Sequence, residues 1–151
     1  MVANMNLSRE ARLFCGVMLL TVPTIMYGGA TLLGILTRGG AGVISGLALD
    51  ETQWALLRAG HAHAGVWVIL SLFLQVLLDA TTLSSAQRLV ARSCAPIGAI
   101  CVSGGFFGLA FLPRLRILLY FGAVSMMLAL VLTAIGLLRR GVPTVTVTSD
   151  R

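Results

Sequence analysis

Charged side chains are scarce in this chain of 151 residues, and lysine is missing altogether. Only 11% of the residues are charged, whereas 58% are hydrophobic. A soluble domain is about 25% charged and about 45–50% apolar. So much apolar surface cannot be hidden in a water-soluble core, which excludes a soluble globular fold. We therefore expect the lipid bilayer to be the solvent and partner of a single membrane domain over residues 1–151.

Acidic residues are the rarer charged kind, because five Asp and Glu stand against eleven arginines, for a net charge of +6. In a soluble protein this excess would suggest nucleic-acid binding. Here the arginines stand beside apolar runs, where such residues set the topology, so we expect no nucleic-acid partner.

The arginines divide between the two sides of the expected membrane. One side holds Arg9, Arg12, Arg88, Arg92, Arg139 and Arg140, and the other holds Arg38, Arg58, Arg114 and Arg116. The positive-inside rule then predicts cytoplasmic N- and C-termini, in a plasma membrane that we expect to be bacterial.

Cysteine motifs are also lacking. Cys15, Cys94 and Cys101 make an odd number and form no C-x-x-C pair. This argues against a disulfide framework or a zinc site, so we expect buried thiols and no dedicated metal site.

What the chain does contain is four long apolar runs. They predict helices over residues 13–36, 51–79, 89–112 and 116–138. Each is close to the ~20 residues that cross ~30 Å of hydrocarbon. The expected fold is an all-α, integral membrane four-helix bundle. A glycine-rich loop is expected from Thr37 to Leu49, and Asp50 with Gln53 predicts a capped start for the second helix.

The second run carries the only two histidines, His61 and His63. Successive helical residues are rotated by ~100°, so the two imidazoles point in nearly opposite directions and are not expected to chelate one ion. His61 shares a face with Arg58, and this pair is the candidate catalytic group, with His61 as acid or base and Arg58 as anion partner. Ionisable residues inside a membrane are functional candidates by default.

Two further polar residues follow on the same helix. We expect Asp79 to pair with Arg88 or Arg92 at the membrane surface, and not to belong to a proton path. Gln75 needs a hydrogen-bond partner, because a buried amide without one is costly.

Glycine pairs predict space near the histidines. Gly28 with Gly29, and Gly104 with Gly105, fall in the same halves of the first and third helices as the histidines do in the second. We expect a mostly apolar pocket there. Its candidate lining residues are Trp54, Trp67, Tyr27, Gln75, Phe106 and Tyr120.

Small residues four apart also predict close helix packing, either within a bundle or in a homo-oligomer or larger membrane complex. The pairs are Ala30 with Gly34, Gly60 with Ala64, and Gly104 with Gly108.

No cofactor is identified by the sequence, but haem is an open alternative, since histidine is its commonest axial ligand. His61 or His63 would supply one side, and a methionine the other, from Met26, Met126 or Met127. A bis-histidine haem would need both histidines from a dimer.

Two local patterns resemble known families. The elements R-A-x-H-A (Arg58 to Ala62) and P-x-x-R (Pro113 to Arg116) resemble the membrane-associated eicosanoid and glutathione enzymes. That resemblance implies a trimer that activates glutathione thiolate, although residues 62–65 hold neither the asparagine nor the glutamate of that family. His61 with Gly65 also resembles the start of the second helix in hydroxylaminobenzene mutase.

Three functions follow from these observations, in this order. The first is a non-catalytic subunit or accessory factor of a membrane complex, with a site formed by His61 and Arg58. The second is a small membrane isomerase or transferase that acts on a lipophilic substrate. The third is haem or metal binding through His61 or His63. The sequence alone does not decide whether the protein is an enzyme.

Overall fold

The computed structural model describes residues 7–37 and 49–139. It contains α1 (Arg9–Thr37), α2 (Glu51–Asp79), α3 (Ser85–Leu109) and α4 (Arg116–Leu138), with a short 3-10 helix η1 (Pro113–Leu115) before α4. No strand occurs in these ranges. All four α-helices are long and apolar enough to cross a membrane, which confirms the expected all-α membrane four-helix fold. The glycine-rich loop expected after Thr37 lies almost wholly outside the described residues.

Helices α2 and α4 occupy the ranges expected from hydropathy, whereas α1 and α3 begin earlier than their apolar runs. Ser8 caps α1, because its Oγ accepts a hydrogen bond from the N–H of Ala11 at 3.1 Å. Ser84 caps α3 and forms a reciprocal box with Gln87. Such caps satisfy free N–H groups of the first turn, so each helix extends into a polar segment that hydropathy does not count.

The start of α2 confirms its expected cap. Asp50 Oδ1 accepts from the N–H of Gln53 at 2.8 Å, and Gln53 Oε1 accepts from the N–H of Asp50 at 3.0 Å. Gln53 also donates through Nε2 to the carbonyl of Ala110 at 2.8 Å. The first turn of α2 is thereby tied to the end of α3.

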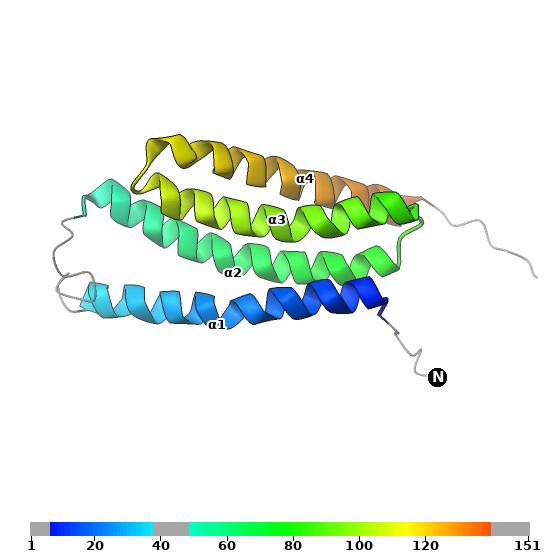
Figure 1. The fold of residues 1–151 in the computed structure, drawn as a ribbon, viewed down its shortest axis with the longest axis horizontal. Coiled ribbons are helices and arrows are strands. Elements are labelled where there is room, and N and C mark those ends of the chain that lie inside the picture. Colours follow the sequence, from blue (N-terminus) through cyan, green and yellow to red (C-terminus); the bar gives the residue numbers. More distant parts are fainter. Residues whose placement is uncertain (1–6, 38–48, 140–151) are drawn as a thin grey trace, which may run out of the picture.

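The four helices lie side by side in chain order, and each runs antiparallel to the next (Figure 1). Helix α2 lies between α1 and α3, and α3 packs extensively on α4. Within the described ranges α1 and α4 do not contact one another. The bundle is therefore an open array, with α1 and α4 as its two edges.

Glycines bring α3 and α4 into backbone contact. A Cβ atom on Gly105 would lie 2.7 Å from backbone atoms of Leu119, and one on Gly122 would lie 2.6 Å from the nitrogen of Val102. Side chains of any size would push the helices apart at these points, so small residues allow their close approach. The neighbouring Gly104 is not at this contact, since its Cβ would meet only the Leu118 side chain at 3.8 Å.

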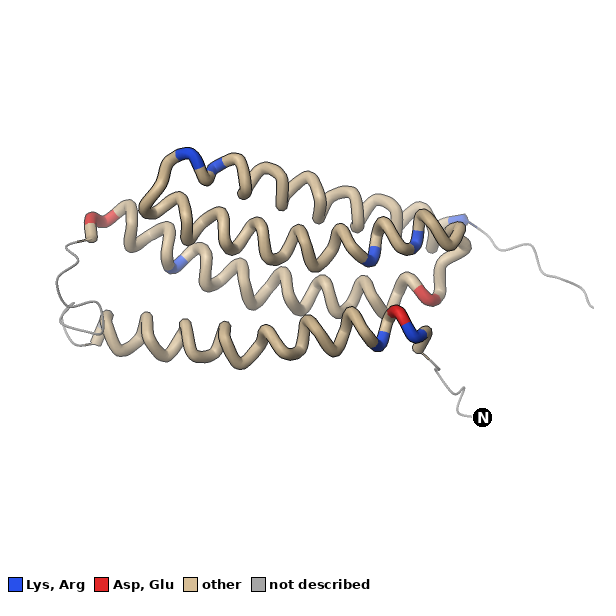
Figure 2. Tube along the Cα trace, viewed as in Figure 1, with Lys and Arg blue, Asp and Glu red and all other residues tan. Residues whose placement is uncertain are grey.

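The core lies along the middle of the array and includes residues from all four helices. Its buried members are Met18, Val68, Leu74, Ala95, Ala99, Met126 and Ala129. Charged residues gather mainly toward the two ends of the helices (Figure 2). This distribution is the one expected when the middle of the bundle is surrounded by hydrocarbon.

Candidate functional site

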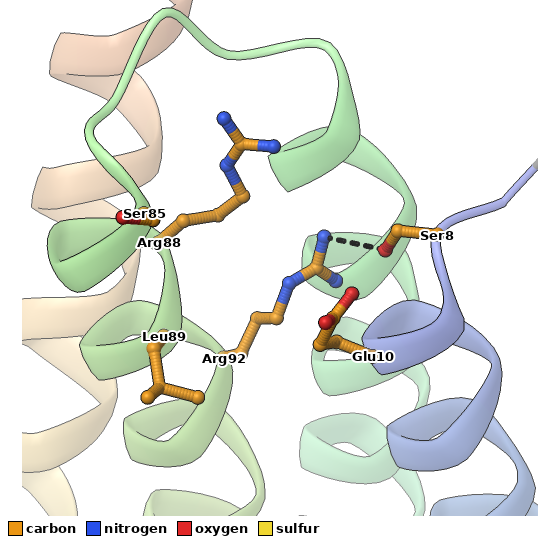
Figure 3. Close-up of a pocket in the computed structure, with 6 residues that line it drawn as sticks. All are labelled: Ser8, Glu10, Ser85, Arg88, Leu89 and Arg92. Carbon is orange, nitrogen blue, oxygen red and sulfur yellow. Dashed lines mark hydrogen bonds between the residues drawn. The ribbon is translucent and has the colours of Figure 1, made fainter.

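A polar cluster closes the end of the bundle where α1 and α3 begin and α2 ends. At its centre is Arg92 of α3, which is only 2% exposed and forms an ion pair with Asp79 of α2. Arg92 also donates to Ser8 Oγ at 3.1 Å (Figure 3). The other oxygen of Asp79 accepts from the backbone N–H of Ser8 at 2.9 Å. The expected pairing of Asp79 with an arginine of α3 is confirmed, and the partner is Arg92.

Gln75 completes this cluster from one turn further inside the membrane. Its side-chain nitrogen donates to the carbonyl of Arg92 at 2.9 Å, and Arg92 donates back to the Gln75 carbonyl at 3.1 Å. Pro96 lies four residues after Arg92 and has no N–H, so the Arg92 carbonyl loses its partner within the helix. Gln75 supplies the missing donor. A fully buried amide and a proline-interrupted helix thus solve each other's hydrogen-bonding problem.

The two histidines of α2 face different neighbours. The ring of His61 lies against α1, where a Cβ on Gly29 would come within 2.9 Å of its Nε2 and Cε1 atoms. Gly28 is also nearby, because its Cβ would lie 3.9 Å from His61 Nδ1. The glycine pair of α1 therefore makes room for an imidazole, as the sequence predicted. Among the described residues, none forms a hydrogen bond with the His61 ring.

The His63 ring lies on the other side of α2, against α3. Its Nδ1 is 2.7 Å from the carbonyl of Ala59, and its ring centroid is 4.5 Å from that of Phe106. Because a carbonyl only accepts, Nδ1 carries the proton and Nε2 keeps its lone pair. Trp67 is a more distant neighbour, with its ring centroid 6.3 Å away. The two imidazoles therefore belong to separate helix interfaces.

Two crevices flank His61 along the seam between α1 and α2. The first has a volume of about 250 Å³, and Trp54 and Leu57 line it from α2. The second has a volume of about 290 Å³, and Ala64 and Val68 line it from α2. These four residues and His61 follow one another at spacings of three and four, which places them on one face of the helix. His61 thus lies on the seam between the two crevices.

Phe107 of α3 lines both crevices. The remaining lining is mostly apolar, with threonine hydroxyls of α1 that already donate to carbonyls of their own helix; these are Thr21, Thr24 and Thr31. The His61 imidazole is therefore the polar group of this seam with donor and acceptor capacity left over.

Comparison with protein-family models, curated proteins and solved structures gives no match for this chain.

The candidate residues from the sequence fall into three places within the described part of the chain. Trp54 and Tyr27 line a crevice beside His61, whereas Trp67 and Phe106 lie near His63. Gln75 belongs to the Arg92 cluster. The structure does not gather the expected lining residues into one pocket, because α2 separates its α1-facing side from its α3-facing side.

Tyr120 and Arg58 are also away from the seam. Tyr120 is 63% exposed on α4, which is at the opposite edge of the array from α1. Arg58 is exposed, and no ion pair with Asp50 or Glu51 forms in the described ranges. Its guanidinium is thus not held in place beside His61 by a charged partner.

Metal and haem ligands can be placed in the same way. Within residues 7–37 and 49–139, no three His, Cys, Asp or Glu side chains come together as a metal site. The three cysteines are free thiols. Met126 is buried in the core, whereas Met26 and Met127 are more than half exposed.

Sequence reasoning missed two members of the polar cluster. Ser8 precedes the first apolar run, and nothing local links it to Asp79, 71 residues away. Pro96 in an apolar run was the available signal for Gln75, because a proline inside a membrane helix leaves a carbonyl that some donor must satisfy.

Proposed function

We propose that this protein is a non-catalytic membrane component that binds a lipophilic small molecule in the seam between α1 and α2. The observation that carries this proposal is the position of His61 between two apolar crevices, with no hydrogen bond to its ring from the described residues. A concave, mostly apolar site with one or two polar groups is the usual form of a small-molecule site. Here the imidazole orients the ligand through a hydrogen bond.

The wider context that we propose is an accessory subunit of a membrane complex. Helix α1 supports this role, because it is an edge helix that packs mainly along α2 and is largely exposed on its other sides. In a complex, a ligand held in the α1–α2 seam would lie at the boundary between this subunit and its surroundings.

The binding proposal is tested by the fluorescence of Trp54, which lines one of the crevices. In full-length protein with Trp67→Phe, a brominated fatty acid added to detergent micelles should quench Trp54 saturably. His61→Asn should weaken this binding about tenfold, because it removes the charge-capable hydrogen-bonding group of the seam.

His63→Asn is the matched control, since it changes an imidazole on the same helix that faces Phe106 instead of α1. It should leave the binding within about twofold. Quenching that never saturates, or equal losses in the two variants, would mean that the fatty acid partitions into the micelle and that the seam is not a site.

Acid–base catalysis on a lipophilic substrate is the first alternative, favoured by the unsatisfied ring of His61. It requires turnover that His61→Asn abolishes and that Cys101→Ala retains. Haem binding is the second, favoured by His63, because ligating histidines usually donate their other N–H to a carbonyl or carboxylate. A Soret band that His63→Asn removes would establish it, and its lack after haem addition would exclude it.

A further inference from the structure

A polar cavity at the other end of the bundle is independent of the α1–α2 seam. It opens where α1 and α3 begin and has a volume of about 310 Å³. Two arginines from α3 contribute to its wall (Figure 3). The full lining is Ser8, Glu10, Ser85, Arg88, Leu89 and Arg92.

The two arginines differ in what they have left to offer. Arg92 is engaged through both terminal nitrogens by Asp79, Gln75 and Ser8. Arg88 donates one terminal nitrogen to the carbonyl of Leu83 at 3.1 Å, while its Nε is buried without a hydrogen-bond partner in the described residues. A buried donor without an acceptor is costly. Arg88 is therefore the group that gains most from an acceptor in the cavity.

The backbone at this end favours the same kind of ligand. Helix α1 begins at Arg9 and α3 begins at Ser85, so two helix N-termini lie beside the cavity. Helix N-termini carry partial positive charge and free N–H groups, which stabilise anions. Ser8 and Ser84 each satisfy only the N–H group two residues into its helix. Glu10 is the one acidic side chain in the lining and opposes an anion.

The cavity also lies at the boundary of the apolar spans. Leu89 lines it and is 54% exposed on the surface of a helix that is apolar enough to cross the membrane. An anion carried by a lipid can place its acyl chains along such a surface while its headgroup enters the cavity. Basic pockets between membrane helices at headgroup level are recurrent sites of anionic lipids.

We propose that this cavity binds the phosphate group of an anionic phospholipid, with Arg88 as its principal contact. The Arg88 Nε–H donates to a phosphate oxygen, and the free N–H groups at the start of α3 donate to others. Arg92 shapes the floor of the site while it stays bound to Asp79. The bound phosphate therefore satisfies the donor that the protein alone leaves unpaired.

Native mass spectrometry of the full chain in mild detergent tests this site. Phosphatidylglycerol should be retained by the unmodified protein, and phosphatidylcholine should be retained about tenfold less. Arg88→Gln should reduce phosphatidylglycerol retention about tenfold. Arg114→Gln is the matched control, because Arg114 is an exposed arginine of η1 at the opposite end, and it should leave retention unchanged.

Glu10→Gln provides a second test that does not depend on how Arg88→Gln folds. Removal of the one carboxylate in the lining should strengthen phosphatidylglycerol retention about threefold. Unchanged or weaker retention in Glu10→Gln, or equal losses in Arg88→Gln and Arg114→Gln, would overturn the site. Full displacement of the lipid by 10 mM (about physiological) inorganic phosphate would overturn phospholipid as the source of the phosphate group.

Discussion

Gln75 shows how much a single polar residue can matter in an apolar helix. It lies in the middle of the membrane domain's α2–α3 contact, fully buried, and bonds to the carbonyl that Pro96 leaves without a partner. Hydrocarbon offers no competing hydrogen bonds, so a carbonyl without a donor remains unsatisfied there. The proline of α3 and the glutamine of α2 therefore form one structural unit, which also holds the guanidinium of Arg92 in place.

Gln75→Leu should lower the free energy of unfolding by about 2 kcal/mol, because it leaves the Arg92 carbonyl and part of the guanidinium without partners. Unfolding in detergent with increasing denaturant measures the change. Phe73→Leu, two residues away on the exposed side of α2, is the control and should change stability by less than about 0.5 kcal/mol. Equal stability of Gln75→Leu and the unmodified protein would show that the Pro96–Gln75 unit does not hold α2 on α3.

At the scale of helices, each contact depends on a particular glycine. His61 fits between α2 and α1 because Gly29 has no side chain, and α3 reaches the backbone of α4 at Gly98, Gly105 and Gly122. The G-x-x-x-G pair of Gly104 and Gly108 predicted close packing on α3. The backbone contact is instead made by Gly105, one residue later, while Gly108 meets the side chain of Leu115.

The adjacent glycines of α3 make a matched pair for mutation. Gly105→Ala places a Cβ 2.7 Å from the Leu119 backbone, so the helices must separate, and we expect a loss of about 2 kcal/mol in stability. Gly104→Ala meets only the Leu118 side chain at 3.8 Å and should cost at most a few tenths of a kcal/mol, offset by the higher helix propensity of alanine. Thermal unfolding of both variants in the same detergent decides between them. The reverse order of stabilities would place α4 on the wrong face of α3.

At the scale of the whole molecule, four antiparallel spans form an open array. An even number of crossings places the two termini on the same side of the membrane. The excess of arginines at that end predicts that this side is the cytoplasm. The phosphate site on Arg88 would then face the inner leaflet, and the His61 seam would lie nearer the outer one.

Topology can be measured with C-terminal fusions in a bacterial plasma membrane. A green fluorescent protein fusion should fluoresce, and an alkaline phosphatase fusion at the same position should be inactive. An N-terminal fluorescent fusion should agree. The opposite pattern at both ends would reverse the orientation, and different answers at the two ends would contradict four complete crossings.

The properties that could be predicted from the sequence are those that depend on local pattern. Four apolar runs predicted the spans, Asp50 and Gln53 predicted a helix start, and Asp79 needed an arginine near the same membrane surface. Each of these follows from chain-local chemistry and the thickness of a bilayer. The glycines opposite His61 were also foreseeable, because depth in the membrane aligns residues on neighbouring helices.

Other features were decided only when the helices packed. A helical periodicity tells which residues share a face, but not which neighbour that face meets, and a rotation of ~100° per residue makes adjacent positions belong to different interfaces. Tertiary structure therefore assigned His61 to α1 and His63 to α3, chose Gly105 over Gly104, and brought Ser8 to Asp79. The amino-acid sequence by itself determined the solvent and the spans, and the packing of α1–α4 determined which polar groups meet.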